Sequence, residues 1–292
     1  LAQWLPRYRH FLDDEAAVFS PRSHTHILMI SPRQRDIYIE QYGTPYGRLH
    51  MLPPGIARDR LAGDDAMAQR RAFRTAHGIG DDELVVLCIG SGFKTKGLDR
   101  SLRAFASLPP GLRSRSRLIA IGDDKPVRFV KQARQLGIAE RFTIWKGRDD
   151  IPQVLQGGDL LLHPAYYENT GTVLLEAVVA GLPVLTTAAC GYAFHVEAAG
   201  AGRVIGEPFA QADLDAALAE MLVSPRRAAW RGNGSRRARR GGAAACCGPD
   251  VGSARAAASA RGSPAPMTWT APWTRSASGA SVSPGRSALP GE

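Results

Sequence analysis

The residues best suited to chemistry lie in two loops, each of which follows an apolar run and precedes a helical pattern. The first loop is residues 90–97, GSGFKTKG, and the second is residues 163–171, HPAYYENTG. Backbone amides at the start of a helix, with lysines beside them, form a site for anions such as phosphate. The first loop is not a P-loop, because Leu98 follows Gly97, and it is not a dinucleotide fingerprint, because Thr95 occupies the third glycine position. On its own it is equally consistent with an exposed basic turn.

Two glutamates, Glu168 and Glu176, stand eight residues apart across the second loop and the helix expected to begin near Gly171. Glu176 then lies about one and a half turns into that helix, inside the apolar run VLLEAVVA. A carboxylate on a buried face needs polar partners, and the two hydroxyls of a ribose would supply them. The alternative is a carboxylate that simply favours a helix start. Between the two glutamates, the free amides of Asn169, Thr170 and Gly171 at the helix start are able to hold a phosphate.

Short apolar runs alternate with helical patterns through most of the chain. Expected strands occupy residues 84–89, 118–121, 142–145, 160–163, 184–186 and 204–205, and expected helices residues 67–77, 98–108, 126–136, 151–156, 172–180, 195–199 and 211–222. Wholly apolar strands separated by helices predict an α/β fold, a Rossmann-like doubly wound parallel sheet. Such sheets bind ligands at the carboxyl ends of their strands, so the strand-to-helix loops are where a site is expected.

A smaller unit precedes this sheet. It consists of a helical pattern, a strand, a second helix with Pro32 at its first position and a second strand, at residues 1–22, 26–30, 32–42 and 49–52. This unit is too small to be a domain. The chain opens on Leu1, with neither Met nor a charged signal-peptide region, which suggests that it begins inside a longer protein.

The net charge of +10 is unevenly distributed. Residues 226–292 hold 11 Arg, no Lys and 2 acidic residues, which leaves 26 basic and 25 acidic residues in 1–225. The folded part is therefore almost neutral, and specific nucleic-acid binding is not expected. The segment 226–292 is predicted to be a disordered or frameshifted basic tail. An RNA-binding tail is the alternative, but the aromatic-interleaved pattern of single-strand binders is missing.

The four cysteines show no ligand spacing, and a metal or redox site is therefore not expected. No run approaches the roughly 18–20 apolar residues of a membrane span. We therefore expect a cytoplasmic protein without metal or other cofactor. His163, at a strand end, is expected to be an ordinary buried histidine with its hydrogen bonds satisfied, and Asp123 and Asp124 a solvated turn.

The E-x7-E spacing, followed by A-x-x-x-G-x-P-V, resembles the donor-site signature of the retaining family-4 glycosyltransferases with the GT-B fold. Five segments are similar to the members of that family that glucosylate the lipopolysaccharide core: LPPGI at 52–56, GSGFKTKGLDRS at 90–101, GDDKP at 122–126, HPAY at 163–166 and GLPVLTTAACGYA at 181–193. The resemblance covers roughly Tyr8 to Trp230. It implies a remnant of the first, acceptor-binding GT-B domain in 1–54 and a nucleotide-sugar donor-binding domain in 55–225.

The resemblance also implies a role for each matching residue. Lys96 would neutralise the leaving diphosphate and Glu168 would hold sugar hydroxyls, and these two are the candidate catalytic residues. Glu176 would bind the ribose diol. The other expected donor-binding residues are the phosphate-holding Asn169, Thr170 and Gly171, together with Gly92, Lys94, Arg60 and Arg148, the last in a loop that borders the uracil.

The activity implied is transfer of a hexose, glucose from UDP-glucose, with retention of configuration to an inner-core heptose of lipopolysaccharide. The protein would contact the cytoplasmic face of the inner membrane peripherally. The family usually has Arg directly before the lysine, whereas Thr95 stands there in this chain and Lys94, which lacks the planar fork of Arg, precedes it. We therefore expect weak donor binding and little transfer. A family-4 enzyme with another acceptor, or a non-enzymatic nucleotide-sugar or nucleic-acid binder, remains as an alternative.

Overall fold

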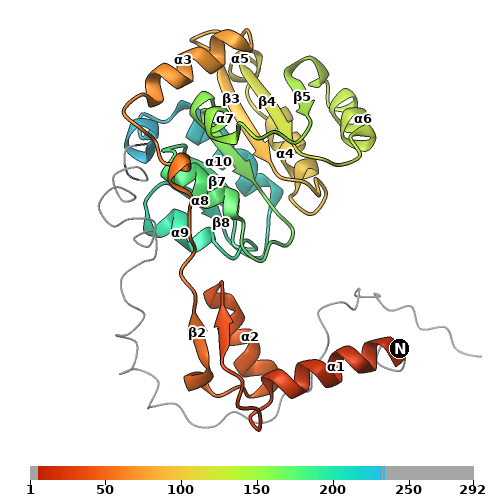
Figure 1. The fold of residues 1–292 in the computed structure, drawn as a ribbon. Coiled ribbons are helices and arrows are strands. Elements are labelled where there is room, and N and C mark those ends of the chain that lie inside the picture. The colour runs from red at the N-terminus through yellow and green to blue at the C-terminus, as the bar shows by residue number, and fades with distance from the viewer. Residues whose placement is uncertain (1–5, 232, 234–292) are drawn as a thin grey trace, which may run out of the picture. The chain divides into compact units, whose positions relative to one another are not determined.

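The computed structural model describes residues 6–231 and 233 (Figure 1). The chain divides into residues 1–251 and 252–292, and all described residues belong to the first unit. The predicted disordered or frameshifted tail at 226–292 therefore lies mostly outside the described residues. Its first residues do not fit that prediction, because residues 227–231 are helical and Trp230 is 5% exposed in the core. The folded chain thus extends past the expected boundary at 225.

The main sheet has six parallel strands in the order β5-β4-β3-β6-β7-β8. In chain order these are β3 (Leu84–Ile89), β4 (Ser116–Ile121), β5 (Phe142–Trp145), β6 (Leu160–His163), β7 (Val184–Thr187) and β8 (Gly202–Ile205). The predicted doubly wound parallel sheet is confirmed. Strand β4 begins two residues before its predicted start, because the polar Ser116 is buried there and its hydroxyl donates to the carbonyl of Leu112 (2.7 Å).

Helices cover both faces of this sheet (Figure 1). The side chains of β3 alternate between the two faces, and each set joins a separate core cluster. One cluster includes α4 (Leu98–Ala106), α5 (Pro110–Ser114), α6 (Val127–Gln135) and α10 (Gln211–Val223), and the other α3 (Ala66–Ala76), α7 (Ile151–Gly157), α8 (Thr172–Val179) and α9 (Ala193–Ala198). Helix α5 was not predicted, since its five residues include one buried residue, Leu112, and show no period. Among the described residues no helix is both long and apolar enough to cross a bilayer.

The strand order changes direction between β3 and β6. From β3 the chain proceeds through β4 to β5, and it then continues on the other side of β3 with β6, β7 and β8. Ligands of open parallel sheets bind outside the carboxyl ends of the strands at such a reversal. The loops that follow β3 and β6 are the two loops that the sequence singles out.

The amino-terminal residues form a second, two-stranded sheet with its own core cluster. This part of the chain contains α1 (Pro6–Phe19), α2 (Pro32–Tyr42) and two parallel strands, β1 (Ile27–Met29) and β2 (Leu49–Met51). The side chain of Gln34 accepts a hydrogen bond from the N–H of Ser31 (3.3 Å), the residue that caps α2. The buried guanidinium of Arg48, in the 3₁₀ turn before β2, donates to the carbonyls of Val18, Ser20 and Thr25. The predicted strand–helix–strand unit is therefore present.

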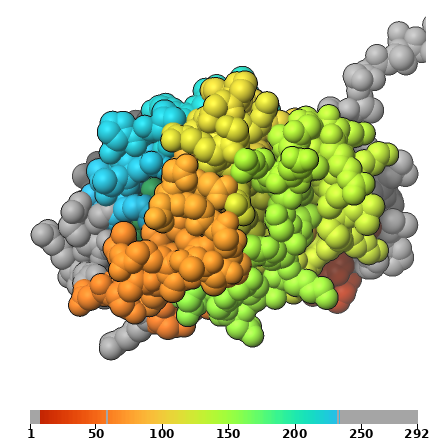
Figure 2. Space-filling view, turned by 90° about the horizontal axis from the view of Figure 1, so that it is seen from above, coloured from red at the N-terminus to blue at the C-terminus, as the bar shows by residue number. Residues whose placement is uncertain are grey.

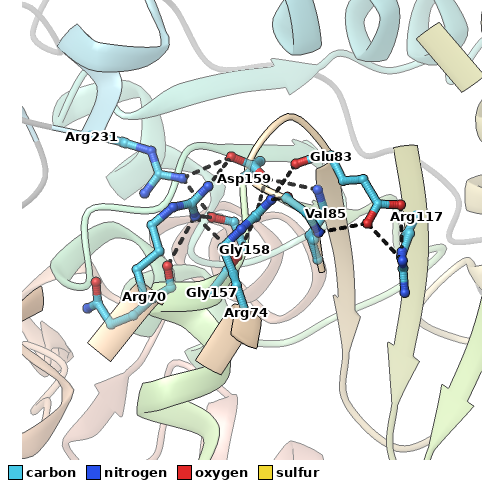
Figure 3. A network of polar contacts seen from close by, with 11 residues as sticks. Arg70, Arg74, Glu83, Val85, Arg117, Gly157, Gly158, Asp159 and Arg231 are labelled. Carbon is cyan, nitrogen blue, oxygen red and sulfur yellow. Dashed lines mark hydrogen bonds and ion pairs between the residues drawn. The ribbon is translucent and has the colours of Figure 1, made fainter. Parts of the chain in front are cut away.

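A network of charges at the opposite, amino-terminal edge of the main sheet joins distant parts of the chain (Figure 3). Asp159, directly before β6, pairs with Arg70 (2.7 Å), Arg74 (3.3 Å) and Arg231 (3.4 Å). The N–H of Val85 also donates to Asp159 (2.9 Å). In Figure 2 the orange α3, which carries two of these arginines, lies beside the blue last residues of the described chain. Asp159 thus ties α3, β3, β6 and the end of the described chain together.

We expect Asp159→Ala to lower the free energy of unfolding by about 3–5 kcal/mol, because removing one partner of a buried ion pair leaves its partners uncompensated. The measurement is urea denaturation of the two proteins. Glu220→Ala is the control, since the Arg203–Glu220 pair is exposed and such pairs contribute about 1 kcal/mol or less. Equal, small losses in both variants would contradict a central role for Asp159.

Candidate functional site

The two candidate catalytic residues meet at the carboxyl ends of β3 and β6. Lys96, in the loop after β3, forms an ion pair with Glu168, in the loop after β6. Their side chains are 26% and 12% exposed, so the pair is largely removed from water. Burial lowers the pKa of Lys96 from its ordinary value. A cation in such a place interacts more strongly with an anion than it would in water.

His163, the last residue of β6, lies behind this pair. Its Nε2 is 3.8 Å from Oε2 of Glu168, and its side chain is 2% exposed. Burial and, secondarily, the Lys96 ammonium lower the pKa of His163 to about 3, so the imidazole is neutral at physiological pH. The expectation of a satisfied histidine is wrong in one respect: Nε2 is buried without a hydrogen-bond partner among the described residues.

The loops after β3 and β6 are in direct backbone contact. The N–H of Tyr166 donates to the carbonyl of Thr95 (2.9 Å). Gly97 has a φ of +75°, and a Cβ added to it would lie 2.0 Å from the carbonyl oxygen of Pro164. Only glycine tolerates both that conformation and that approach. Gly97 therefore sets the separation of the two loops, and with it the distance between Lys96 and Glu168.

Two residues that the sequence analysis did not single out strengthen this junction. The guanidinium of Arg100 donates to the carbonyls of Pro164 (3.2 Å) and Ala165 (3.1 Å). It lies 3.6 Å from the ring centroid of Tyr166 and 3.7 Å from that of Phe209. The hydroxyl of Tyr166 donates to Asp99 (2.8 Å). The available signal was position, because Asp99 and Arg100 stand in the first turn of the helix that the first loop opens.

The segment 169–171 presents the amides expected to hold phosphate. The carbonyls of Glu168 and Thr170 accept hydrogen bonds from the N–H groups of Gly191 (2.9 Å) and Tyr192 (2.8 Å). The amides of residues 169–171, in contrast, donate no hydrogen bond within the described part of the chain. Gly171, with a φ of +84°, caps α8. The segment is therefore held through its carbonyls, and its amides at the start of a helix are free for an anion.

Glu176, on α8, forms a second and longer ion pair with Arg60. Oε2 of Glu176 is 3.9 Å from Nη1 of Arg60, and the side chains are 21% and 25% exposed. Arg60 ends a 3₁₀ turn, η3 (Arg58–Arg60), and the N–H of Ala62 just after it donates to the carbonyl of Val179 (3.1 Å). Burial raises the pKa of Glu176, Arg60 opposes that shift, and Asp59 adds to it. The carboxylate is thus held in a place that disfavours its charge.

Of the other expected donor-binding residues, Gly92 and Lys94 are exposed in the first loop. Asn169 accepts a hydrogen bond from the hydroxyl of Tyr167 (2.8 Å). Arg148 pairs with both carboxylate oxygens of Asp150 (2.6 Å each) and lies over the ring of Trp145. Because β5 is two strands away from β3, Arg148 is separated from the Lys96–Glu168 pair.

The turn at residues 123 and 124 has more structure than expected. Both side chains are exposed, but Asp124 accepts a hydrogen bond from the N–H of Phe93 (2.8 Å) and Asp123 accepts one from the N–H of Gly147 (3.1 Å). The turn therefore links the loops that follow β3, β4 and β5.

As for metals, the His, Cys, Asp and Glu side chains of residues 6–231 and 233 form no group of three that would hold an ion.

The reversed strand order, with the two loops of the candidate site at the reversal, defines a Rossmann-like domain, as in one half of a GT-B fold. Residues 69–237 match the family model of the glycosyl transferases group 1, and the chain belongs to this family. The predicted glycosyltransferase family is confirmed.

Relatives in this family give more detail. The chain is 42% identical over 228 residues to the lipopolysaccharide glucosyltransferase WaaG of Escherichia coli (strain K12), covering 78% of this chain and 61% of that protein. It is 28% identical over 229 residues to the alpha-D-kanosaminyltransferase of Streptomyces kanamyceticus, covering 77% of this chain and 55% of that protein. The chain therefore spans less than two thirds of the length of these relatives.

Solved structures support the fold. The crystal structure of WaaG, a glycosyltransferase involved in lipopolysaccharide biosynthesis, superposes with a TM-score of 0.77 at 40% identity, over 84% of this chain and 66% of that one. Anabaena Alr3699/HepE in complex with UDP and glucose superposes with a TM-score of 0.66 at 22% identity, over 80% of this chain and 62% of that one. The second likeness concerns the fold alone.

We expect Gly97→Ala to destabilise the protein by about 3 kcal/mol and to weaken anion binding at the two loops. The left-handed conformation alone costs about 1–2 kcal/mol in a residue with a Cβ, and the clash with Pro164 adds to it. Gly137→Ala is the matched control, because its φ is +69° and its added Cβ would meet nothing within 4 Å. Urea denaturation and calorimetric titration with UDP are the measurements. Equal losses of stability and of UDP affinity in the two variants would contradict the claim that Gly97 sets the separation of the two loops.

The raised pKa of Glu176 predicts a stability effect with a definite sign. Between the ordinary value of 4.5 and the raised value, the folded protein binds a proton that the unfolded chain has lost. Stability contributed by this group therefore falls as pH rises through that window. We expect Glu176→Gln to raise Tm at pH 7, with the gain shrinking as pH falls to 4.5.

The measurement is thermal unfolding across pH, with the exposed Glu197→Gln as the control. A lower Tm for Glu176→Gln at pH 7 would mean that attraction to Arg60 outweighs the burial of the carboxylate.

Proposed function

We propose that this chain is the donor-binding part of a retaining hexosyltransferase that uses a UDP-sugar, specifically UDP-glucose. The observation that carries the proposal is the combination at the strand reversal of Lys96 with the free amides of residues 169–171. A largely buried cation and a helix start together suit a diphosphate. The family membership and the 42% identity to a lipopolysaccharide glucosyltransferase support the choice of donor.

The chemistry follows from the charge that the reaction creates. Breaking the bond between the sugar and UDP leaves negative charge on the β-phosphate. Fixed donors aimed at that charge stabilise it as it forms, and Lys96 and the amides of residues 169–171 are such donors. This role requires no metal or other cofactor, and their absence remains a prediction. Glu168, next to Lys96, is then placed to hold the hydroxyls of the transferred sugar.

Glu176 suits the ribose. Its carboxylate has two oxygens, little exposure and one distant partner, Arg60. Two adjacent hydroxyls would donate to both oxygens and satisfy a group that burial otherwise disfavours. Arg148 beside Trp145 is proposed to border the uracil. Since Lys94 is exposed, the diphosphate would depend mainly on Lys96, which is consistent with the weak binding expected from Thr95.

For the acceptor, we propose the heptose of a lipopolysaccharide inner core, in a cytoplasmic protein that contacts the membrane peripherally. The proposal depends on similarity to WaaG, which its name describes as a lipopolysaccharide glucosyltransferase. A family member with a different acceptor is the alternative, and acceptor assays of the complete protein would distinguish the two. A nucleic-acid binder is disfavoured, because residues 1–225 carry a net charge of only +1, from 26 basic and 25 acidic residues.

The test is calorimetric titration of the chain with UDP and with UDP-glucose. We expect Lys96→Ala and Glu176→Ala each to weaken binding at least about tenfold, the effect of losing a hydrogen bond to a charged group. Lys131→Ala is the matched control, since Lys131 is exposed on α6. Circular dichroism checks that each variant is folded. A folded wild-type chain that binds neither ligand would overturn the proposal.

A further inference from the structure

The carboxylate of Glu168 faces two potential donors from different elements. Lys96 reaches Oε2 from the loop after β3, and Nε2 of His163 lies 3.8 Å from the same oxygen at the end of β6. Only Lys96 forms an ion pair at bonding distance. Because 3.8 Å is longer than a hydrogen bond, His163 does not bind Glu168 in this arrangement, in which Lys96 does.

The backbone of His163 is firmly held. It pairs with Thr186 in the parallel ladder between β6 and β7, and its carbonyl accepts the hydroxyl of Thr186 (2.9 Å). His163 borders a small pocket whose other walls are Lys96, Cys88, Gly90 and four apolar side chains, namely Ile89, Phe93, Leu98 and Leu162. Burial raises the pKa of Cys88 to about 12, so this neighbour is an uncharged thiol. Among the described residues, the carboxylate within 4.0 Å of the buried Nε2 is that of Glu168.

A donor diphosphate would compete with Glu168 for Lys96, which under the proposed function must stabilise the leaving group. The Glu168 carboxylate, which is 12% exposed, would then no longer be oriented by Lys96, although it must be oriented to bind the sugar hydroxyls. A neutral imidazole carries one N–H and would replace the ammonium without adding a second cation beside Lys96. His163 remains neutral because burial lowers its pKa to about 3.

We propose that His163 is a positioning residue whose Nε2–H hydrogen-bonds Glu168 when the donor diphosphate engages Lys96, and so aims that carboxylate at the sugar. This inference rests on the proposed function. The two parts of the donor are then bound by different groups. Lys96 and the helix-start amides bind the diphosphate, and a carboxylate that His163 orients binds the sugar. Loss of His163 should therefore affect UDP-glucose binding and spare UDP binding.

The experiment compares His163→Leu and His163→Gln with the wild-type chain by calorimetry. We expect His163→Leu to bind UDP within about twofold of wild type and UDP-glucose about tenfold more weakly, the size of one hydrogen bond to a charged group. His163→Gln, whose amide keeps an N–H donor, should recover most of the UDP-glucose affinity. In a Glu168→Gln background, His163→Leu should change the ratio of the two affinities by less than about twofold.

Equal weakening of both ligands by His163→Leu would indicate a merely structural histidine, and unchanged binding of both would show that His163 has no role. Either result overturns the inference while wild-type UDP binding upholds the proposed function. A second readout uses the wild-type chain with ¹⁵N-labelled histidine. The Nε2–H proton of His163, assigned by its loss in His163→Gln, should move downfield when UDP-glucose saturates the site, and a stationary resonance would also overturn the inference.

Discussion

The candidate site depends on one close approach, that of the Gly97 backbone to the carbonyl of Pro164. It brings together the loops of two neighbouring strands that are far apart in sequence. Arg100 then fixes the junction through two carbonyls and two aromatic rings. Because the loops are joined through backbone atoms, the positions of Lys96 and Glu168 follow from the geometry of the sheet rather than from flexible side chains. Such a rigid frame keeps opposite charges near each other without letting them drift to solvent.

The site also holds charged groups in places that oppose their ionisation. Burial lowers the pKa of Lys96 and raises that of Glu176. Among the described residues, Lys96 forms an ion pair with Glu168 and Glu176 one with Arg60. A ligand that replaces these partners binds more strongly, because the charges it contacts are poorly solvated by water. The domain is therefore less stable at the carboxyl edge of its sheet than it would be with uncharged groups there, whereas at the amino edge the Asp159 carboxylate is paired with three arginines.

The sequence was informative wherever apolar period and strand-to-helix loops decide the structure. The strands at 84–89, 142–145 and 160–163 have their predicted bounds, because each is a mainly apolar run that begins directly after a charged residue. The pairing of Lys96 with Glu168 was not predicted, since it depends on which loops become adjacent, and that is set by strand order. Arg100 was missed for the same reason, since the two carbonyls that it binds are more than 60 residues away in the chain. The unpaired Nε2 of His163 was missed because the lack of a hydrogen-bond partner depends on how the surrounding side chains pack. Trp230 was assigned to the tail because nothing around it repeats, although a single large ring suffices to extend a core.

Asp159 and Arg231 are 72 residues apart, and this separation matters when the chain is made. On the ribosome, the sheet and both its helical layers emerge before the third arginine does. Until Arg231 leaves the exit tunnel, Arg70 and Arg74 are the arginines that pair with the carboxylate, and Trp230 has not reached the core. The domain is therefore completed late in synthesis, from its far end, at the edge of the sheet opposite to the one where the candidate site lies.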